Sequence, residues 1–488
     1  MIVAETGHGK LRGAEIADGV LAWRGVPYAR PPVGRLRLRP PEPPDPWSGV
    51  RDTLAYGNRS LQPGAPGSLG PQTPTDEDCL YLNVTAPAGA VPPAPGERPV
   101  LFWIHGGGYE MGAGPDQAGD GVAFAESHGL VVVTVNYRLG ALGFLDVEGE
   151  RPTGAFGLHD QIAALRWTRR NIAAFGGDPE RITVYGLSAG GKSVTNLLAS
   201  PLASGLVAQA AESSGGDHVK DTAQARDLAA RFFRTLGAAP DRIRDVPAAD
   251  ILGAQLAIET PPRSTWIWRP SIDGVALTAH PLTAIASGTA AGIPLLLQTC
   301  ARETALYALL APDAARQTDQ VLSGYFGRET ADKILAGYAA RYPDLSETEL
   351  RVAVMTDERY VVRTERLADA QAAHAPVWRS RYDGPYTGLD DDPDFAMYAD
   401  LLHGAHGGDG TGIWQGGAGL SANLHEAWGA FSTAGDPGWN GYTSPGRRAM
   451  IFAPEGPHLA ADPFAFARET WAGLDWQPGT WWTPDGVA

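Results

Sequence analysis

One short segment, Gly186-Leu187-Ser188-Ala189-Gly190, constrains the fold of this chain more than any other. It fits the pattern G-x-S-x-G, follows an apolar, β-rich run at 181–187 and precedes a helical stretch. In that context the pattern is typical of a sharp strand-to-helix turn, in which small flanking residues avoid clashes and the serine hydroxyl is raised to the carboxyl edge of a sheet. The segment therefore predicts Ser188 as a nucleophile. The alternative is a plain turn, because the bare pattern also arises by chance among 61 glycines.

Several other apolar runs are short and lead into glycine-rich or helical segments. They lie at 100–104, 130–137, 293–299 and 376–383, with a weaker candidate at 449–454. Continuous apolar strands that alternate with helices predict a mostly parallel central sheet flanked by helices on both faces, which is an α/β fold. The helical spacing of 160–175 stops at Gly176-Gly177, a plausible C-terminal signal.

Two stretches, 220–265 and 305–372, interrupt this alternation. They are rich in Ala, Arg, Leu and Asp and have helical periodicity without a strand pattern. We expect them to be helical insertions that form a cap or side wall over the sheet. The chain as a whole, 1–488, is then predicted to be a single catalytic domain that has grown by insertion.

A run of glycines, His105-Gly106-Gly107-Gly108-Tyr109, follows the predicted strand at 100–104. Consecutive glycines allow backbone N–H groups to approach a ligand closely. Acyl transfer creates an oxyanion, and donors aimed at it contribute on the order of several kcal/mol to the transition state. The predicted donors are the N–H groups of Gly107, Gly108 and Ala189. A flexible loop and a phosphate cradle are the alternatives, although the Lys-Ser or Lys-Thr ending of a phosphate loop is absent.

A serine nucleophile needs a base, and the base needs an orienting carboxylate, in the chain order Ser, acid, His. Glu303 is the nearest carboxylate beyond the predicted strand that precedes it. His403 and His406 both lie in a glycine-rich loop after 376–383 and are both candidates for the base. The two histidines also fit a metal pair with Asp409 as a third ligand, but no H-E-x-x-H helix accompanies them.

Further motifs give the chain a resemblance to the type B carboxylesterase family, which includes para-nitrobenzyl esterases, cholinesterases and mammalian liver carboxylesterases. The resemblance covers nearly the whole chain and implies the α/β-hydrolase fold. The segments that carry it are WRGVPYARPPVG at 23–34, EDCLYLN at 77–83, NYRLG at 136–140, FGGDP at 175–179 and FSTAGDP at 431–437.

The resemblance also implies which residues form the site. The family acid is a Glu a few residues past a strand, where Glu303 lies. The family histidine is followed by Gly and, two residues later, by an acidic residue, which matches His406 in His406-Gly-Gly-Asp409 and not His403. Together with Ser188 these residues form the predicted catalytic triad. Ser214 is similar to a buried family serine that hydrogen-bonds near the triad and would have a supporting role. No cofactor is required.

Three departures from the family pattern affect the prediction. Leu187 stands where the family usually has Glu, which removes a negative charge beside the nucleophile and argues against cationic substrates. Thr304 follows Glu303, where the family usually has Gly. The family disulfide of secreted members cannot form, because no cysteine precedes Cys79.

The overall charge and the cysteine content limit the partners and the location. The chain has 39 Lys and Arg against 55 Asp and Glu, a net charge of −16, which disfavours nucleic acid. Two cysteines, Cys79 and Cys300, are too few for a disulfide framework. No signal peptide is visible, and no apolar run approaches the ~20 residues that span a bilayer. We therefore expect a soluble cytoplasmic protein without a membrane partner; the sequence does not predict its oligomeric state.

The predicted function is a serine carboxylic-ester hydrolase that acts through an acyl-enzyme on small uncharged aryl or alkyl esters. A carbamate or amide hydrolase with the same triad is one alternative. A catalytically inactive binding module on a hydrolase scaffold is another, but such a module would not need the intact set of triad residues and the glycine run.

Overall fold

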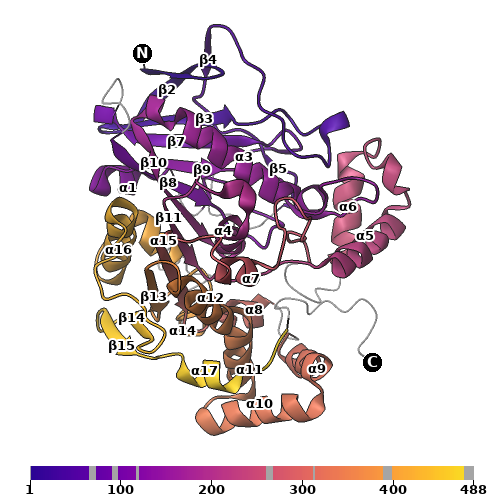
Figure 1. Cartoon of the computed structure of the whole chain (residues 1–488), viewed down its shortest axis with the longest axis vertical. Coiled ribbons are helices and arrows are strands. Elements are labelled where there is room, and N and C mark those ends of the chain that lie inside the picture. The colour runs from indigo at the N-terminus through magenta and orange to yellow at the C-terminus, as the bar shows by residue number, and fades with distance from the viewer. Residues whose placement is uncertain are drawn as a thin grey trace.

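The computed structural model describes residues 2–64, 73–90, 97–116, 120–259, 267–310, 314–387 and 398–476. In these ranges a 13-stranded mixed sheet runs through the molecule, with helices packed on both of its faces (Figure 1). The strands, in sheet order, are β1 (Ile2–Thr6), β2 (Gly9–Ala17), β3 (Val20–Pro27), β7 (Tyr81–Pro87), β9 (Val131–Val135), β8 (Arg98–Ile104), β10 (Gly177–Leu187), β11 (Gln209–Ser213), β12 (Leu295–Cys300), β13 (Val377–Tyr382), β14 (Arg448–Phe452) and β15 (His458–Ala461), with β4 (Val50–Asp52) beside β2. Two short strands, β5 (Arg59–Ser60) and β6 (Thr75–Asp76), pair separately.

The centre of the sheet is parallel. Every neighbouring pair from β9 through β14 is parallel, whereas β1, β2, β3 and β7 form an antiparallel arm on one side and β15 an antiparallel edge on the other. All six apolar runs identified in the sequence are strands, namely β8, β9, β10, β12, β13 and β14. Because parallel strands end at one edge, the loops after β8, β10, β12 and β13 gather at the same place.

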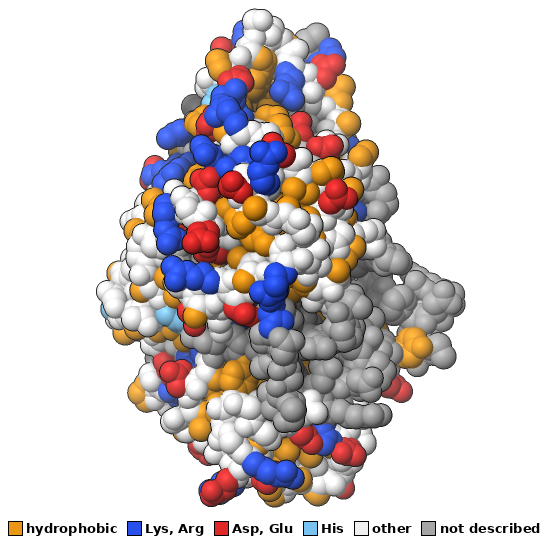
Figure 2. All heavy atoms as spheres, turned by 90° about the vertical axis from the view of Figure 1, so that its right-hand side faces the viewer, with side chains coloured by type: hydrophobic (Ala, Val, Ile, Leu, Met, Phe, Trp, Pro, Cys, Tyr) orange, Lys and Arg blue, Asp and Glu red, His pale blue; other side chains and the backbone are white. Residues whose placement is uncertain are grey.

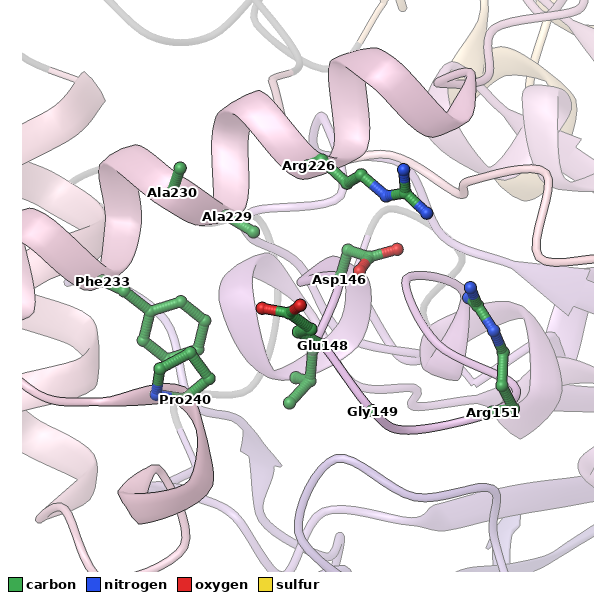
Figure 3. A pocket seen from close by; sticks show the side chains of 10 residues that line it. Asp146, Glu148, Gly149, Arg151, Arg226, Ala229, Ala230, Phe233 and Pro240 are labelled. Atoms are coloured by element: carbon green, nitrogen blue, oxygen red, sulfur yellow. The ribbon is translucent and has the colours of Figure 1, made fainter.

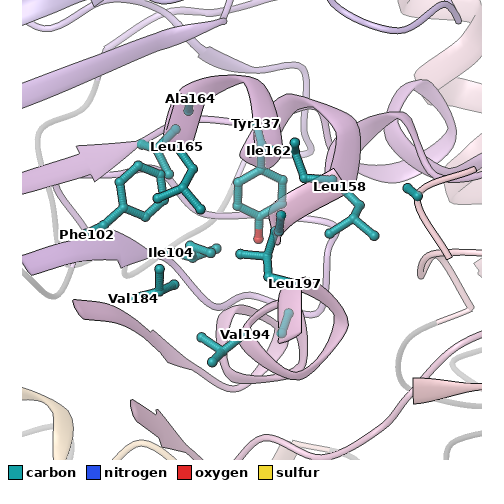
Figure 4. Close-up of a cluster of buried hydrophobic side chains, with 14 of the residues drawn as sticks. Phe102, Ile104, Tyr137, Leu158, Ile162, Ala164, Leu165, Val184, Val194 and Leu197 are labelled. Atoms are coloured by element: carbon teal, nitrogen blue, oxygen red, sulfur yellow. The ribbon is translucent and has the colours of Figure 1, made fainter. Parts of the chain in front are cut away.

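Two helices fix the position of β10 and of the turn that follows it. Helix α3 (Phe156–Asn171) and helix α4 (Ala189–Ala199) cover the strands, and both are largely buried. Each fully buried Leu or Ile side chain contributes roughly 1.5–3 kcal/mol of transfer free energy. Figure 4 shows the side chains that fill this layer: Phe102, Ile104, Tyr137, Leu158, Ile162, Ala164, Leu165, Val184, Val194 and Leu197.

Helix α3 ends close to the predicted position. It continues as a 3-10 turn, η3 (Ile172–Phe175), and Gly176 then takes φ 83°, a left-handed conformation that glycine adopts without strain. Strand β10 starts immediately afterwards at Gly177.

The two stretches that interrupt the strand–helix alternation are helical where the structure describes them. The first contains α5 (Thr222–Leu236), the 3-10 turn η5 (Pro240–Arg242) and α6 (Ala248–Glu259). The second contains α8 (Ala305–Leu310), α9 (Ala314–Phe326), α10 (Arg328–Arg341), α11 (Glu347–Thr356), the π-turn η6 (Asp357–Val361) and α12 (Val362–Ala372). Residues 260–265 and 311–313 of these stretches lie outside the described ranges. In Figure 1, α5 and α6 flank the sheet on one side, and α9 and α10 lie beyond its lower end.

Helix α5 leaves a surface cavity of about 440 Å³ between itself and the loop at 146–151. Figure 3 shows Asp146 and Glu148 on the loop side and Arg226 on α5. Burial raises the pKa of Asp146, and nearby cations, Arg151 first, act against that shift. On the face that carries α5 and α6, acidic and basic side chains are interspersed over the described part of the surface (Figure 2). Within the described ranges, no helix is both long and apolar enough to cross a bilayer.

Candidate active site

Ser188 occupies the sharp turn between β10 and α4. Its backbone has φ 59° and ψ −119°, outside the region that ordinary residues favour. The strained turn is held from both sides: the Ser188 N–H donates to the carbonyl of Ser213 at 2.9 Å, and the Ser188 carbonyl accepts from the N–H of Lys192 at 2.9 Å. The nucleophile predicted from the sequence therefore stands at the start of a helix and at the carboxyl edge of the sheet.

The two glycines of the motif are required by close backbone contacts. A Cβ at Gly186 would lie 2.2 Å from the carbonyl oxygen of Gly190, and a Cβ at Gly190 would lie 2.0 Å from that of Ile104. Neither backbone atom can move without shifting a central strand or the helix start. The small residues of the G-x-S-x-G pattern thus follow from the packing of this turn.

The glycine run after β8 lies directly against the nucleophile. A Cβ at Gly106 would be 3.2 Å from the Cβ of Ser188, and Gly107 and Gly108 have φ values of 106° and 66°. At Gly107 a Cβ would also lie 2.2 Å from the carbonyl oxygen of Met111, so only glycine fits. Ala189, at the first position of α4, has an N–H that no intrahelical carbonyl can accept. Gly106 thus lies against Ser188, and Ala189 directly follows the nucleophile in the turn.

His105 shapes that loop, a role the sequence analysis did not assign. Its Nδ1–H donates to the carbonyl of Gly106 at 2.8 Å, and its ring stacks on Tyr137 with centroids 4.5 Å apart. Tyr137 in turn donates its hydroxyl to the carbonyl of His105 at 2.9 Å. Burial lowers the pKa of His105 to about 4, so the ring is neutral near pH 7. In the sequence, the signal for this role is the position of His105 directly before three consecutive glycines.

His406 faces Ser188 from the loop after β13. The Ser188 hydroxyl donates to Nε2 of His406, with Oγ and Nε2 2.8 Å apart. The other ring nitrogen, Nδ1, donates to Oε2 of Glu303 at 2.6 Å. The three predicted triad side chains therefore form one continuous hydrogen-bonded row. All three are buried, with Ser188 5 % exposed and Glu303 0 %.

Glu303 is fixed by the loop after β12. Its second carboxylate oxygen accepts the backbone N–H of Cys300 at 2.8 Å. Thr304, which replaces the family glycine, does not disturb this arrangement, because its hydroxyl donates to the carbonyl of Val352 at 2.9 Å in α11. Helix α11 therefore accommodates Thr304, the residue that departs from the family pattern, next to Glu303.

The three residues of the alternative metal-site prediction, His403, His406 and Asp409, contact three different partners. Nε2 of His403 lies 3.5 Å from a carboxylate oxygen of Asp383, away from the His406 row. Asp409 is buried and accepts from the side-chain amide of Gln298. Among the described residues, no group of three or more His, Cys, Asp or Glu side chains is placed to hold a metal ion.

Ser214, the predicted supporting residue, directly follows strand β11. Its φ is 53°, its N–H donates to the carbonyl of Gln298 at 2.8 Å, and its Oγ is 3.9 Å from Sγ of Cys300. It thus contacts the loop that holds Glu303 and not the triad side chains in the contacts described. Two tyrosines that the sequence analysis missed flank the base: the rings of Tyr360 and Tyr307 lie 5.0 and 5.8 Å from that of His406.

Comparison with known proteins identifies the family of this chain. The model of the carboxylesterase family matches residues 2–437. The para-nitrobenzyl esterase of Bacillus subtilis (strain 168) is 37% identical over 478 residues, which cover 93% of this chain and 95% of the relative. A solved structure of a PNB esterase matches with a TM-score of 0.83 at 34% identity, covering 96% of this chain and 99% of the other. The carboxylesterase of Geobacillus stearothermophilus matches with a TM-score of 0.82 at 35% identity, covering 96% and 100%.

The fold is therefore the α/β-hydrolase fold, and the site geometry is that of a serine hydrolase. The chain belongs to the carboxylesterase family. It is a carboxylic ester hydrolase that uses a serine, as the sequence analysis predicted.

Proposed function

We propose that Ser188, His406 and Glu303 are the catalytic triad of this esterase, with the N–H groups of Gly107, Gly108 and Ala189 as the oxyanion hole. The observation that carries the proposal is the unbroken row from Glu303 through His406 to Ser188, with contacts of 2.6 and 2.8 Å. These distances lie within the reach required for proton transfer between nucleophile and base.

The reaction has two steps. His406 takes the hydroxyl proton of Ser188 as the oxygen attacks the ester carbonyl, and the negative charge that develops on the carbonyl oxygen is held by the three N–H groups. His406 then gives its proton to the leaving alcohol, and the acyl group remains on Ser188 as an ester. Water, deprotonated by His406, attacks this acyl-enzyme; His406 then returns the proton to the leaving Oγ of Ser188 and the acid is released. Glu303 keeps the ring in the correct tautomer and stabilises its positive charge.

The substrates that we propose are small uncharged aryl or alkyl esters. Leu187 supports this: its Cδ2 lies 3.9 Å from the position that a Cβ would take at Gly407, so an apolar side chain fills the space beside the His406 loop. A carboxylate at position 187 would instead favour a cationic group near the nucleophile.

The test of the triad is covalent labelling followed by peptide mapping. A fluorophosphonate probe should modify the wild-type protein stoichiometrically on the peptide that contains Ser188, with loss of 4-nitrophenyl acetate hydrolysis. Ser188→Ala should abolish both labelling and turnover while retaining its circular dichroism spectrum. Labelling at another residue, or turnover retained by the variant, would contradict the proposal.

A panel of substrates distinguishes an ester hydrolase from the alternative amide or carbamate hydrolase. We expect 4-nitrophenyl acetate to be cleaved at least a thousandfold faster than 4-nitroacetanilide, because the amide nitrogen leaves poorly unless His406 protonates it. A comparable rate on the anilide, or on a 4-nitrophenyl carbamate with steady turnover, would instead favour those alternatives.

We also propose a cytoplasmic location. Cys79 and Cys300 are both buried as free thiols, and burial raises the pKa of each thiol, which keeps it protonated. A reducing compartment preserves thiols in this form. Activity in the cytoplasmic fraction of the producing cell is the measurement that checks this location.

A further inference from the structure

The cavity between helix α5 and the loop at 146–151 has the size of a small-molecule site. Its volume is about 440 Å³, which falls in the range of roughly 300–1,000 Å³ typical of ligand pockets. The described residues that line it are Asp146, Val147, Glu148, Gly149, Arg151, Arg226, Ala229, Ala230, Phe233 and Pro240 (Figure 3). None of these residues belongs to the proposed triad or to the glycine run after β8.

One face of α5 forms a wall of the cavity that has two unlike ends. Arg226, Ala229, Ala230 and Phe233 follow one another at helical spacing, so they share one side of α5. Arg226 and Phe233 are about 10 Å apart along the helix axis. The small side chains of the two alanines leave the space between the guanidinium and the ring open. A ligand that contacts both ends therefore combines a charged group with an apolar body.

The loop that forms the opposite wall is held in place by hydrogen bonds. The N–H of Val147 donates to the hydroxyl of Thr153 at 2.7 Å. Glu150, the next residue after the lining glycine of this loop, accepts from the guanidinium of Arg244 at 2.8 Å. Because these contacts fix the loop without a ligand, the cavity is already formed before anything binds in it.

Two arginines give one end of the cavity a positive charge. In Figure 3 the guanidinium groups of Arg226 and Arg151 lie at the same end as the carboxylate of Asp146. The carboxylate of Glu148 points the other way, toward Phe233. Both arginines are exposed, and neither makes an ion-pair contact with an Asp or Glu of the described ranges. Asp146 offsets one of the two positive charges at most, so this end attracts an anion.

The chemistry of the two ends selects the anion. A planar guanidinium presents paired N–H groups that match a carboxylate, and such charge-assisted hydrogen bonds are among the stronger ones in proteins. At the other end, the ring of Phe233 and the side chain of Pro240 offer apolar surface. An aryl or alkyl group placed there leaves water and gains contact area.

We propose that this cavity is a second binding site of the protein, which takes a carboxylic acid with an aryl or short alkyl tail. The carboxylate binds at the end formed by Arg226 and Arg151, and the tail packs along α5 toward Phe233. Acids of this class are also released when an ester is hydrolysed, so the product of the enzyme belongs to the class that the site accepts. Only this last link rests on the proposed function.

Binding of three matched probes tests the charge of the ligand. The probes are 4-phenylbutanoate, 4-phenylbutanamide and 4-phenylbutylamine, which share one tail and differ in the head group. In calorimetric titrations of the full-length protein at low salt, we expect the acid to bind about tenfold more tightly than the amide or the amine, because only the acid can form charge-assisted hydrogen bonds with the arginines.

Variants then assign the binding to the cavity. Arg226→Gln should weaken binding of the acid about tenfold and leave binding of the amide unchanged. Phe233→Ala should weaken binding of the acid and of the amide by a similar factor, because both lose the contact with the ring. The matched control is Arg234→Gln, an exposed residue of α5 outside the cavity lining, which gives the same change in net charge and should bind as wild type.

Two results would overturn the inference. Tighter binding of the amine than of the acid would assign the cavity to cations, with Glu148 as their partner. Binding of the acid that is equal in wild type and in Arg226→Gln, with the variant folded by circular dichroism, would place the acid elsewhere in the protein. These titrations use no ester, so neither result bears on the triad, and failure of Ser188 to react with the fluorophosphonate probe would leave the second site standing.

Discussion

Glu303 holds His406 at two points of contact. Its Oε2 accepts the ring Nδ1–H at 2.6 Å, and its backbone carbonyl accepts the backbone N–H of the same histidine at 3.2 Å. The adjacent residues extend this contact, since Arg302 donates its N–H to the carbonyl of Gly404 at 2.7 Å. The loops after β12 and β13 are therefore joined through backbone as well as side-chain bonds, which fixes the position of the His406 ring relative to Ser188.

Glu303→Gln tests whether the carboxylate sets the state of the histidine. The amide oxygen can still accept the N–H of Cys300, but the amide NH₂ then faces Nδ1 and favours the tautomer with a proton on Nε2, which cannot accept from Ser188. We expect kcat to fall roughly a thousandfold to ten-thousandfold with the fold intact. A loss smaller than tenfold, in stopped assays with 4-nitrophenyl acetate, would show that Glu303 does not orient the base.

The two histidines of the same loop should differ sharply. His406→Ala removes the proposed base and should lower kcat by at least a thousandfold. His403→Ala should keep activity within about threefold of wild type, because its ring is 38 % exposed and its nearest acidic partner is Asp383. Equal losses in the two variants would mean that His403 also takes part in the reaction.

Gly190→Ala tests the steric origin of the nucleophile turn. The added Cβ would meet the carbonyl oxygen of Ile104 at 2.0 Å, backbone against backbone, so we expect a loss of about 3 kcal/mol or more in the free energy of unfolding, with loss of activity. The matched control is Gly253→Ala in α6, where nothing lies within 4 Å of the new atom. There the change should be neutral or stabilise by up to about 1 kcal/mol, because alanine favours the helix. Urea unfolding curves of both variants provide the comparison.

The parallel part of the sheet and the polar residues at its edge were predictable because local patterns determine them. Strands β8, β9 and β12 are continuous apolar runs, and the turn at Ser188 depends on glycines that the sequence shows directly. The choice between His403 and His406 was not determined by local pattern. It depended on the family resemblance, because the hydrogen bond between Glu303 and His406 joins residues 103 positions apart in the chain.

Other elements gave no such pattern. Strand β11 contains Glu212 within a five-residue segment, so its burial is not visible in the sequence, although the side chain is 0 % exposed. Strands β1, β2 and β4 mix polar and apolar residues and carry no single strong signal. Lys192 resembles a surface lysine on a helix in the sequence, but in the structure it is 1 % exposed and contacts the Tyr360 ring and the Ser214 carbonyl. Long-range packing overrides residue type at these positions.

The buried carboxyl of Glu212 makes stability depend on pH in a defined direction. Burial raises its pKa to about 7 from an ordinary value near 4.5, while a hydrogen bond from Thr195 acts against the shift. Between those two pH values the folded protein holds a proton that the unfolded chain has lost. The contribution of Glu212 to stability is therefore complete below about pH 4.5 and decreases as the pH rises through 7.

Glu212→Gln removes this titration and leaves a neutral side chain that Thr195 can still contact. The difference in unfolding free energy, wild type minus variant, should decrease between pH 4.5 and pH 7 with a slope of at most about 1.4 kcal/mol per pH unit, and should level off above that range. Guanidinium unfolding of both proteins at half-unit steps of pH measures it. A difference that stays constant or increases over this range would mean that Glu212 is already ionised in the folded state, with Lys192 as its counter-ion.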